Sequence, residues 1–151
     1  MISVDVLSED KNWSKKIKKK KIFFNSICKA FPTRYQFKNK KISLTLMLSN
    51  NKKIKKLNKI FKKKDKPTDI LSFPLQKKIK IQNKTYLGDI IISYNFMSKK
   101  KEKKLFEEKV IKTFIHGFLH LLGFDHIKLK DYNKMMKQEQ KIYKSVVKNI
   151  S

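Results

Sequence analysis

Apolar residues recur at every second position in several short stretches of the chain, and this period of two predicts strands. The first two predicted strands, 2–6 and 42–48, alternate regularly between apolar and polar residues. Apolar, β-rich runs predict two more at 70–74, where a closing proline cannot donate to a ladder, and at 86–93. A hairpin arm around 79–81 is expected between these last two strands.

Other segments repeat their apolar residues every three or four positions, which predicts helices. The first is predicted to start at Asn12 or Ser14, as the N-cap, and to run to about Phe31. Asn50 is a candidate N-cap for a second, short helix. The apolar stripe expected to be buried on that second helix consists of Ile54, Leu57, Ile60 and Phe61.

The longest helix is predicted from about Ser98, and its segment 115–122 is apolar nearly all round, as in a core helix. Gly123 is expected to end it. Asp131 can cap a last helix whose apolar positions continue towards the C-terminus. This alternation of strands and helices predicts a single α/β domain over 1–151, with no repeats and no linker typical of a domain boundary.

Charge is the most unusual property of the composition. The chain has 39 basic and 12 acidic residues, a formal net charge of +27, and Arg34 is its only arginine. Two explanations stay open. The lysines attract a polyanion such as nucleic acid, or they record the codon bias of a genome rich in A and T.

The compartment is expected to be the cytosol. Cys28 is the only cysteine, so no disulfide partner exists and a reducing environment is indicated. The first ten residues do not have the pattern of a signal peptide. No apolar run approaches the ~20 residues that span a bilayer, so no membrane association is expected.

All three histidines of the chain fall within eleven residues, which predicts a metal site. His116 and His120 are four residues apart and share one face of the predicted helix. Gly123 can turn the chain so that His126 returns as a third ligand. Three protein ligands leave one position open, as in catalytic zinc sites, so we expect one Zn²⁺ per chain.

The residue after the first histidine argues against a peptidase. Zinc proteases with this histidine spacing have a glutamate there as general base, and this chain has Gly117. Asp125 directly precedes His126, so we interpret it as a residue that orients a ligand or holds the loop rather than as a ligand.

Three segments together resemble one known family. The segment 116–126 reads His-Gly-Phe-Leu-His-Leu-Leu-Gly-Phe-Asp-His, and 87–90 reads Leu-Gly-Asp-Ile. The remaining segment, 57–74, begins with Leu-Asn and ends with Lys-Asp-Lys-Pro-Thr-Asp-Ile-Leu-Ser-Phe-Pro. This set resembles the YbeY-type endoribonucleases of bacteria. The resemblance implies a zincin-like α/β fold with a small, mostly parallel mixed sheet packed against helices and a central metal-binding helix. It also implies a zinc-dependent, single-strand-specific ribonuclease that acts in maturation of small-subunit ribosomal RNA and in ribosome quality control.

The resemblance assigns roles to individual residues. It implies that His116, His120 and His126 are the zinc ligands. Lys62 stands where the family usually has arginine, and it is expected to neutralise charge on the scissile phosphate, with Lys63 and Lys64 as alternatives one or two residues on.

Other polar residues in the matching segments are candidates for the wall of the site. Ser72, with Thr68 and Asp69, is expected beside the metal helix, where Ser72 would contact substrate. Asp89 is expected either to orient a ligand or loop or to complete a turn.

The leading hypothesis is metal-dependent cleavage of single-stranded RNA, with the attacking group, water or the RNA 2′-hydroxyl, left open. A ribosome-assembly or RNA-binding factor with a mainly structural metal is the alternative, because the surface is rich in lysine. A metallopeptidase is the third possibility, and Gly117 argues against it.

Overall fold

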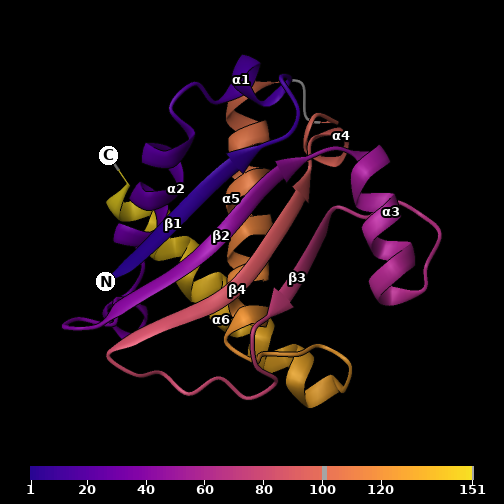
Figure 1. Ribbon diagram of the computed structural model, residues 1–151. Helices are drawn as coiled ribbons and strands as arrows, with labels where there is room; N and C mark the ends of the chain where they lie inside the picture. The colour runs from indigo at the N-terminus through magenta and orange to yellow at the C-terminus, as the bar shows by residue number, and fades with distance from the viewer. Residues whose placement is uncertain (100–101, 151) are drawn as a thin grey trace.

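A four-stranded sheet forms the centre of the computed structural model, which describes residues 1–99 and 102–150 (Figure 1). Its strands lie in the order β1 (Ile2–Ser8), β2 (Lys41–Ser49), β4 (Lys84–Ser93) and β3 (Ile70–Pro74). The pairs β1–β2 and β2–β4 are parallel, and β3 pairs antiparallel with β4 at one edge. The expected α/β fold with a mostly parallel mixed sheet is confirmed.

Helices lie against both faces of this sheet, and one face is covered by more helices than the other. Those longer than two turns are α2 (Lys20–Lys29), α3 (Asn51–Lys62), α5 (Lys103–Leu121) and α6 (Leu129–Asn149). The shorter ones are α1 (Trp13–Lys16), the 3₁₀ turn η1 (Thr33–Tyr35) and α4 (Tyr94–Met97). In Figure 1, α2, α5 and α6 lie behind the sheet, while α3 stands beside the β3 edge.

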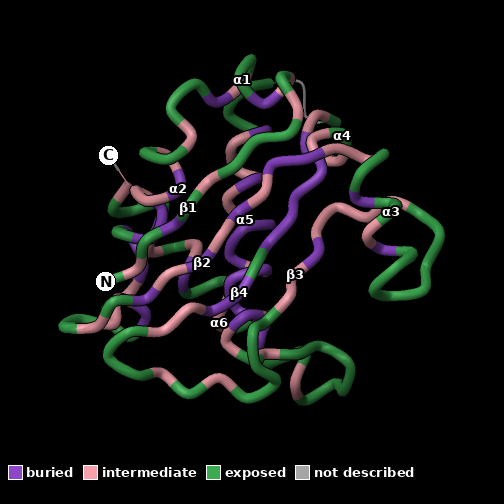
Figure 2. The backbone as a smooth tube through the Cα atoms, viewed as in Figure 1, coloured by how far each residue is buried: buried purple, intermediate pink, exposed green. Residues whose placement is uncertain are grey.

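The main core lies between the sheet and the α2, α5 and α6 layer. It takes alternate residues of the strands, such as Leu44, Leu46 and Leu48, and both sides of α5 near its C-terminal end. Figure 2 shows the buried segments concentrated along β2, β4 and α5. A small second cluster of Ile54, Leu71 and Ile91 joins α3 to the other face of β3 and β4. The prediction that α5 lies in the core is confirmed.

The first predicted helix is wrong as a continuous element. It is interrupted at Ile17, which has extended backbone (φ −129°, ψ 104°), and Asn12 makes no side-chain cap. Lysines fill 15–16 and 18–21, so a continuous helix would align many like charges three and four residues apart, which is unfavourable. Trp13 and Ile17 are still buried, as the apolar pattern indicated.

The predicted hairpin arm at 79–81 is also wrong. The segment between β3 and β4 is a loop without strand pairing, although Ile79 and Ile81 pack against the main core. Asn50 does cap α3, because its side chain accepts a hydrogen bond from the backbone N–H of Lys53 at 3.0 Å.

The predicted ends of the later helices need correction. The helix expected from about Ser98 begins at Lys103, and Ser98 instead ends α4. Positions 100–101 of that prediction lie outside the described residues. The last helix begins after Lys128, so Asp131 lies in its first turn rather than at its cap.

The C-terminal end of α3 is more exposed than its apolar pattern predicted. Ile54 is buried, but Ile60 and Phe61 are 66% and 61% exposed rather than part of a buried stripe. Among the residues that the structure describes, no helix combines the length and apolarity required to cross a bilayer.

Candidate metal centre

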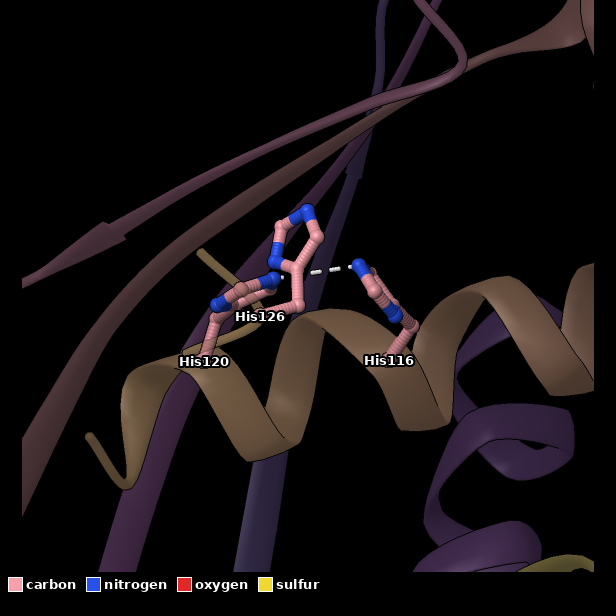
Figure 3. Close-up of side chains that lie close together, drawn as sticks. All are labelled: His116, His120 and His126. Carbon is pink, nitrogen blue, oxygen red and sulfur yellow. Dashed lines mark hydrogen bonds between the residues drawn. The ribbon is translucent and has the colours of Figure 1, made fainter. Parts of the chain in front are cut away.

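The end of α5 brings the three histidines together. His116 and His120 lie one turn apart on this helix, which ends in a Schellman motif. The N–H of Gly123 donates to the His120 carbonyl at 3.0 Å, and the N–H of Phe124 donates to the Leu119 carbonyl at 3.0 Å. The motif requires a left-handed residue, and Gly123 supplies it with φ +98°. The chain therefore reverses, and His126 lies beside the other two rings (Figure 3).

Hydrogen bonds on the outer side of the two helical histidines select their tautomers. His120 Nδ1 lies 2.9 Å from the Phe124 carbonyl oxygen, and His116 Nδ1 lies 2.6 Å from Oε1 of Glu139. A carbonyl and a carboxylate can only accept, so each Nδ1 carries the proton. In the neutral rings, both Nε2 atoms then present lone pairs.

These two lone pairs face each other. The Nε2 atoms of His116 and His120 are 3.0 Å apart (Figure 3). Two unprotonated nitrogens cannot form a hydrogen bond with each other, whereas a metal ion between them would accept both lone pairs. Ligands ~2.0–2.1 Å from a tetrahedral zinc would lie about 3.3 Å apart, close to this separation.

The third histidine completes a set that could hold a metal ion. One ring nitrogen from each of His116, His120 and His126 lies within 4.8 Å of the others. Burial and, to a smaller extent, electrostatic repulsion between its protonated form and the His116 ring lower the pKa of His120 below its ordinary value of 6.5. His120 is therefore neutral near pH 7, which is the form of imidazole that binds metals.

Close packing explains the glycine between the first two histidines. A Cβ on Gly117 would lie 2.6 Å from Cδ1 of Ile70, 3.1 Å from Oγ of Ser72 and 3.2 Å from Cδ1 of Ile90. Ser72 also donates its hydroxyl to the Gly117 carbonyl at 3.3 Å. The helix is thus pressed against β3 and β4 here, and a side chain at position 117 would have to displace the side-chain ends of Ile70, Ser72 and Ile90.

The histidines line a cleft of about 750 Å³ that runs beside β3. The lysines that line it are Lys62, Lys64, Lys66 and Lys77, and the acids are Asp69 and Asp125. The cleft is therefore basic, apart from these two carboxylates.

Comparison with known proteins decides the family. The model of the family described as Endoribonuclease YbeY matches residues 6–147. A protein named Endoribonuclease YbeY from Pelagibacter ubique is 62% identical over 148 residues, covering 97% of each chain. The chain belongs to the endoribonuclease YbeY family.

Further relatives and a solved structure agree with this assignment. Endoribonuclease YbeY of Buchnera aphidicola is 40% identical over 139 residues, covering 91% of this chain and 84% of its own. A Thermotoga maritima protein solved in solution has 25% identity and a TM-score of 0.53, over 97% of this chain and 89% of its own. The similarity to known proteins therefore extends over nearly the whole chain.

The structure places most of the predicted site residues at the cleft. Lys62, at the end of α3, lines it, as do Thr68, Asp69 and Ser72 on and before β3. Lys64 lines the cleft as well, whereas Lys63 takes the left-handed conformation that ends α3. Lys62 is thus on the same cleft as the histidines, and its contact with phosphate remains a prediction.

The two aspartates expected near the ligands have different positions. Asp125 lines the cleft and accepts a hydrogen bond from the Ile127 N–H at 2.6 Å, within the loop that carries His126. Asp89 does not approach the histidines, because Ile90 faces α5 and the preceding side chain points to the other face of the sheet. There its carboxylate accepts from the Tyr86 hydroxyl.

Sequence reasoning missed Glu139, the partner of His116. It comes from α6, 23 residues after His116, so no local spacing connects the two. A signal was nevertheless present. Glu139 lies four residues after Met135 and three before Ile142, within the buried stripe of α6. A carboxylate in an apolar stripe usually has a polar partner across the interface.

Proposed function

We propose that this protein is a zinc-dependent endoribonuclease that cleaves single-stranded RNA, with small-subunit ribosomal RNA as its physiological substrate. The family supports cleavage of RNA, because the relatives that share its whole length are named endoribonucleases. We also propose that its partners are ribosomal RNA and the small ribosomal subunit. It acts in ribosome quality control and is located in the cytosol.

The observation that carries the proposal is the pair of His116 and His120 Nε2 atoms, 3.0 Å apart, at the edge of a lysine-lined cleft. The outer hydrogen bonds to Phe124 and Glu139 hold both nitrogens in this orientation before any ion arrives. A site organised in this way loses little entropy on binding a cation, and the adjacent lysines attract the polyanionic substrate.

The chemistry follows from these groups. His116, His120 and His126 would hold the zinc through neutral imidazole nitrogens, and the bound ion would supply a Lewis acid. Lys62 contacts a phosphate oxygen of the bound strand and offsets the negative charge that grows during cleavage. Glu139 keeps the His116 ring in its metal-binding tautomer. Position 117, directly after the first histidine, is glycine and offers no carboxylate as base, so the proton acceptor comes from elsewhere in the cleft or from the RNA.

Two measurements test the proposal. The purified protein is expected to contain about one zinc per chain, and His120→Ala is expected to lose it. At matched zinc concentration, wild type is expected to cut single-stranded ribosomal RNA, while His116→Ala does not. Equal cleavage by both proteins would contradict the proposal. Folding of the variants is checked by circular dichroism, because a structural metal predicts unfolding instead of a folded, inactive protein.

A further inference from the structure

The exposed end of α3 carries an aromatic surface outside the metal cleft. Phe61 is 61% exposed, and its ring contacts Phe73 of β3 at a centroid separation of 5.2 Å and an interplanar angle of 61°. Phe73 is opposite Asp89 in the sheet, so it lies on the face away from α5. Figure 1 shows α3 beside β3, and Figure 2 shows that much of the surface of α3 is exposed.

This aromatic pair is continuous with the cleft through one lysine. Lys62 lines the cleft, and its Nζ lies 5.8 Å from the centre of the Phe73 ring. Ser72 and Pro74, the neighbours of Phe73 in β3, also line the cleft. A strand that leaves the histidines and crosses β3 therefore passes Lys62 and then reaches the Phe61–Phe73 pair.

The chemistry of this route matches single-stranded RNA. Proteins that bind single strands combine cations along the backbone with aromatic rings on which the bases stack. Lys62 supplies the cation between the cleft and the rings, and Phe61 supplies an exposed aromatic face. A protein partner would also bury an exposed phenylalanine, but the shared lysine and the direct continuation of the cleft favour the nucleic acid.

We propose that Phe61 and Phe73 form a stacking subsite for one base of the RNA, across β3 from the metal centre, with Lys62 on the phosphate between them. The inference rests on the proposed function, because the occupant of the subsite is the substrate of the cleft. The subsite holds the strand and takes no part in bond cleavage.

The test compares Phe61→Ala with Phe61→Trp, Phe61→Leu and the control Ile60→Ala. Ile60 is the neighbouring residue on α3 and is 66% exposed, so the control removes a similar amount of exposed apolar surface. Affinity for a single-stranded RNA oligonucleotide is measured at fixed salt. Phe61→Ala is expected to weaken it roughly 5- to 150-fold, which corresponds to about 1–3 kcal/mol per stacked base. Phe61→Trp retains affinity, Phe61→Leu loses it, and Ile60→Ala has no effect.

Kinetics and a modified substrate make the test specific. The KM of cleavage is expected to rise in Phe61→Ala, with kcat unchanged at saturating RNA. Affinity is also measured for a set of oligonucleotides that each lack one base. At one position, removal of the base is expected to weaken RNA binding by wild type but not by Phe61→Ala, because the base and the Phe61 ring are the two partners of one stacking contact.

The outcomes distinguish the subsite from the function. Affinity of Phe61→Ala or Phe61→Leu equal to that of wild type overturns the subsite, as does an abasic series without a coupled position. A protein-docking surface predicts that result. If wild type binds RNA without cutting it, the proposed function fails, while the affinity and abasic measurements still decide on the subsite.

Discussion

Removal of the Glu139 carboxylate should weaken metal binding much more than it weakens the fold. Glu139 accepts from His116 Nδ1 at 2.6 Å, and both side chains are about one third exposed, at 32% and 31%. Partly exposed ion pairs contribute only ~0–1 kcal/mol to stability. Loss of a carboxylate that orients a ligating histidine typically lowers metal affinity about 10- to 100-fold, or roughly 1.4–2.7 kcal/mol.

Two substitutions separate the charge of Glu139 from its hydrogen bond. Glu139→Gln keeps an oxygen that can accept from Nδ1, so we expect a loss of zinc affinity near the lower end, about 10-fold. Glu139→Ala frees the His116 ring to rotate and to change tautomer, so we expect about 100-fold. Both variants lack the charge of Glu139, so the tenfold difference in their zinc affinity measures the contribution of the hydrogen bond that orients His116.

The assay is competition for zinc with a chromogenic chelator, together with thermal unfolding of the metal-free protein. Glu107→Gln removes the same charge from α5 and serves as the control, because Glu107 borders a separate hollow near α2. Unfolding of metal-free Glu139→Gln is expected to be close to that of wild type. Wild-type zinc affinity in Glu139→Ala would refute the reasoning.

Three further predictions concern stability. Gly117→Ala should lower the free energy of unfolding in urea by up to about 2 kcal/mol. The contact with Ile70 costs ~1–3 kcal/mol, and the higher helix propensity of alanine offsets only about 1 kcal/mol of this. An unchanged unfolding midpoint would disprove the close packing. Lys63→Gly should stabilise the protein by about 0.5–1 kcal/mol, because Lys63 has φ 57° and glycine adopts this left-handed conformation without strain. Lys59→Gly should destabilise the protein, because glycine is unfavourable in the interior of α3. Metal-free protein should lose stability as the pH falls from 6.5, because the lowered pKa of His120 makes the unfolded chain bind more protons; His120→Asn should flatten this dependence.

The sequence alone was sufficient wherever the physical cause is local. Strand alternation and helix periodicity depend on neighbours along the chain, so the four strands and the core position of α5 were predicted correctly. The convergence of His116, His120 and His126 needs only one helical turn and a glycine turn, and both are visible as spacing. The family resemblance rested on the same local segments.

Local patterns were misleading where tertiary contacts decide. Phe61 continues the apolar stripe of α3, but α3 stands at the edge of the sheet, and no residue spacing shows where the second core cluster ends. The direction in which Asp89 points depends on the register of β4, which is set by its pairing with β2 and β3.

The candidate metal centre depends on both the local sequence and the tertiary structure. The three histidines are determined by sequence, because their geometry follows from the backbone between 116 and 126. The tautomer of His116 is determined by Glu139, which reaches it only because α6 packs along α5. The absence of a carboxylate at position 117 can be read from the sequence, but the close approach of β3 and β4 to α5 at this glycine exists only in the folded chain. The clustering of the three histidines is a property of a short segment, whereas the orientation of the His116 ring requires two distant segments to meet.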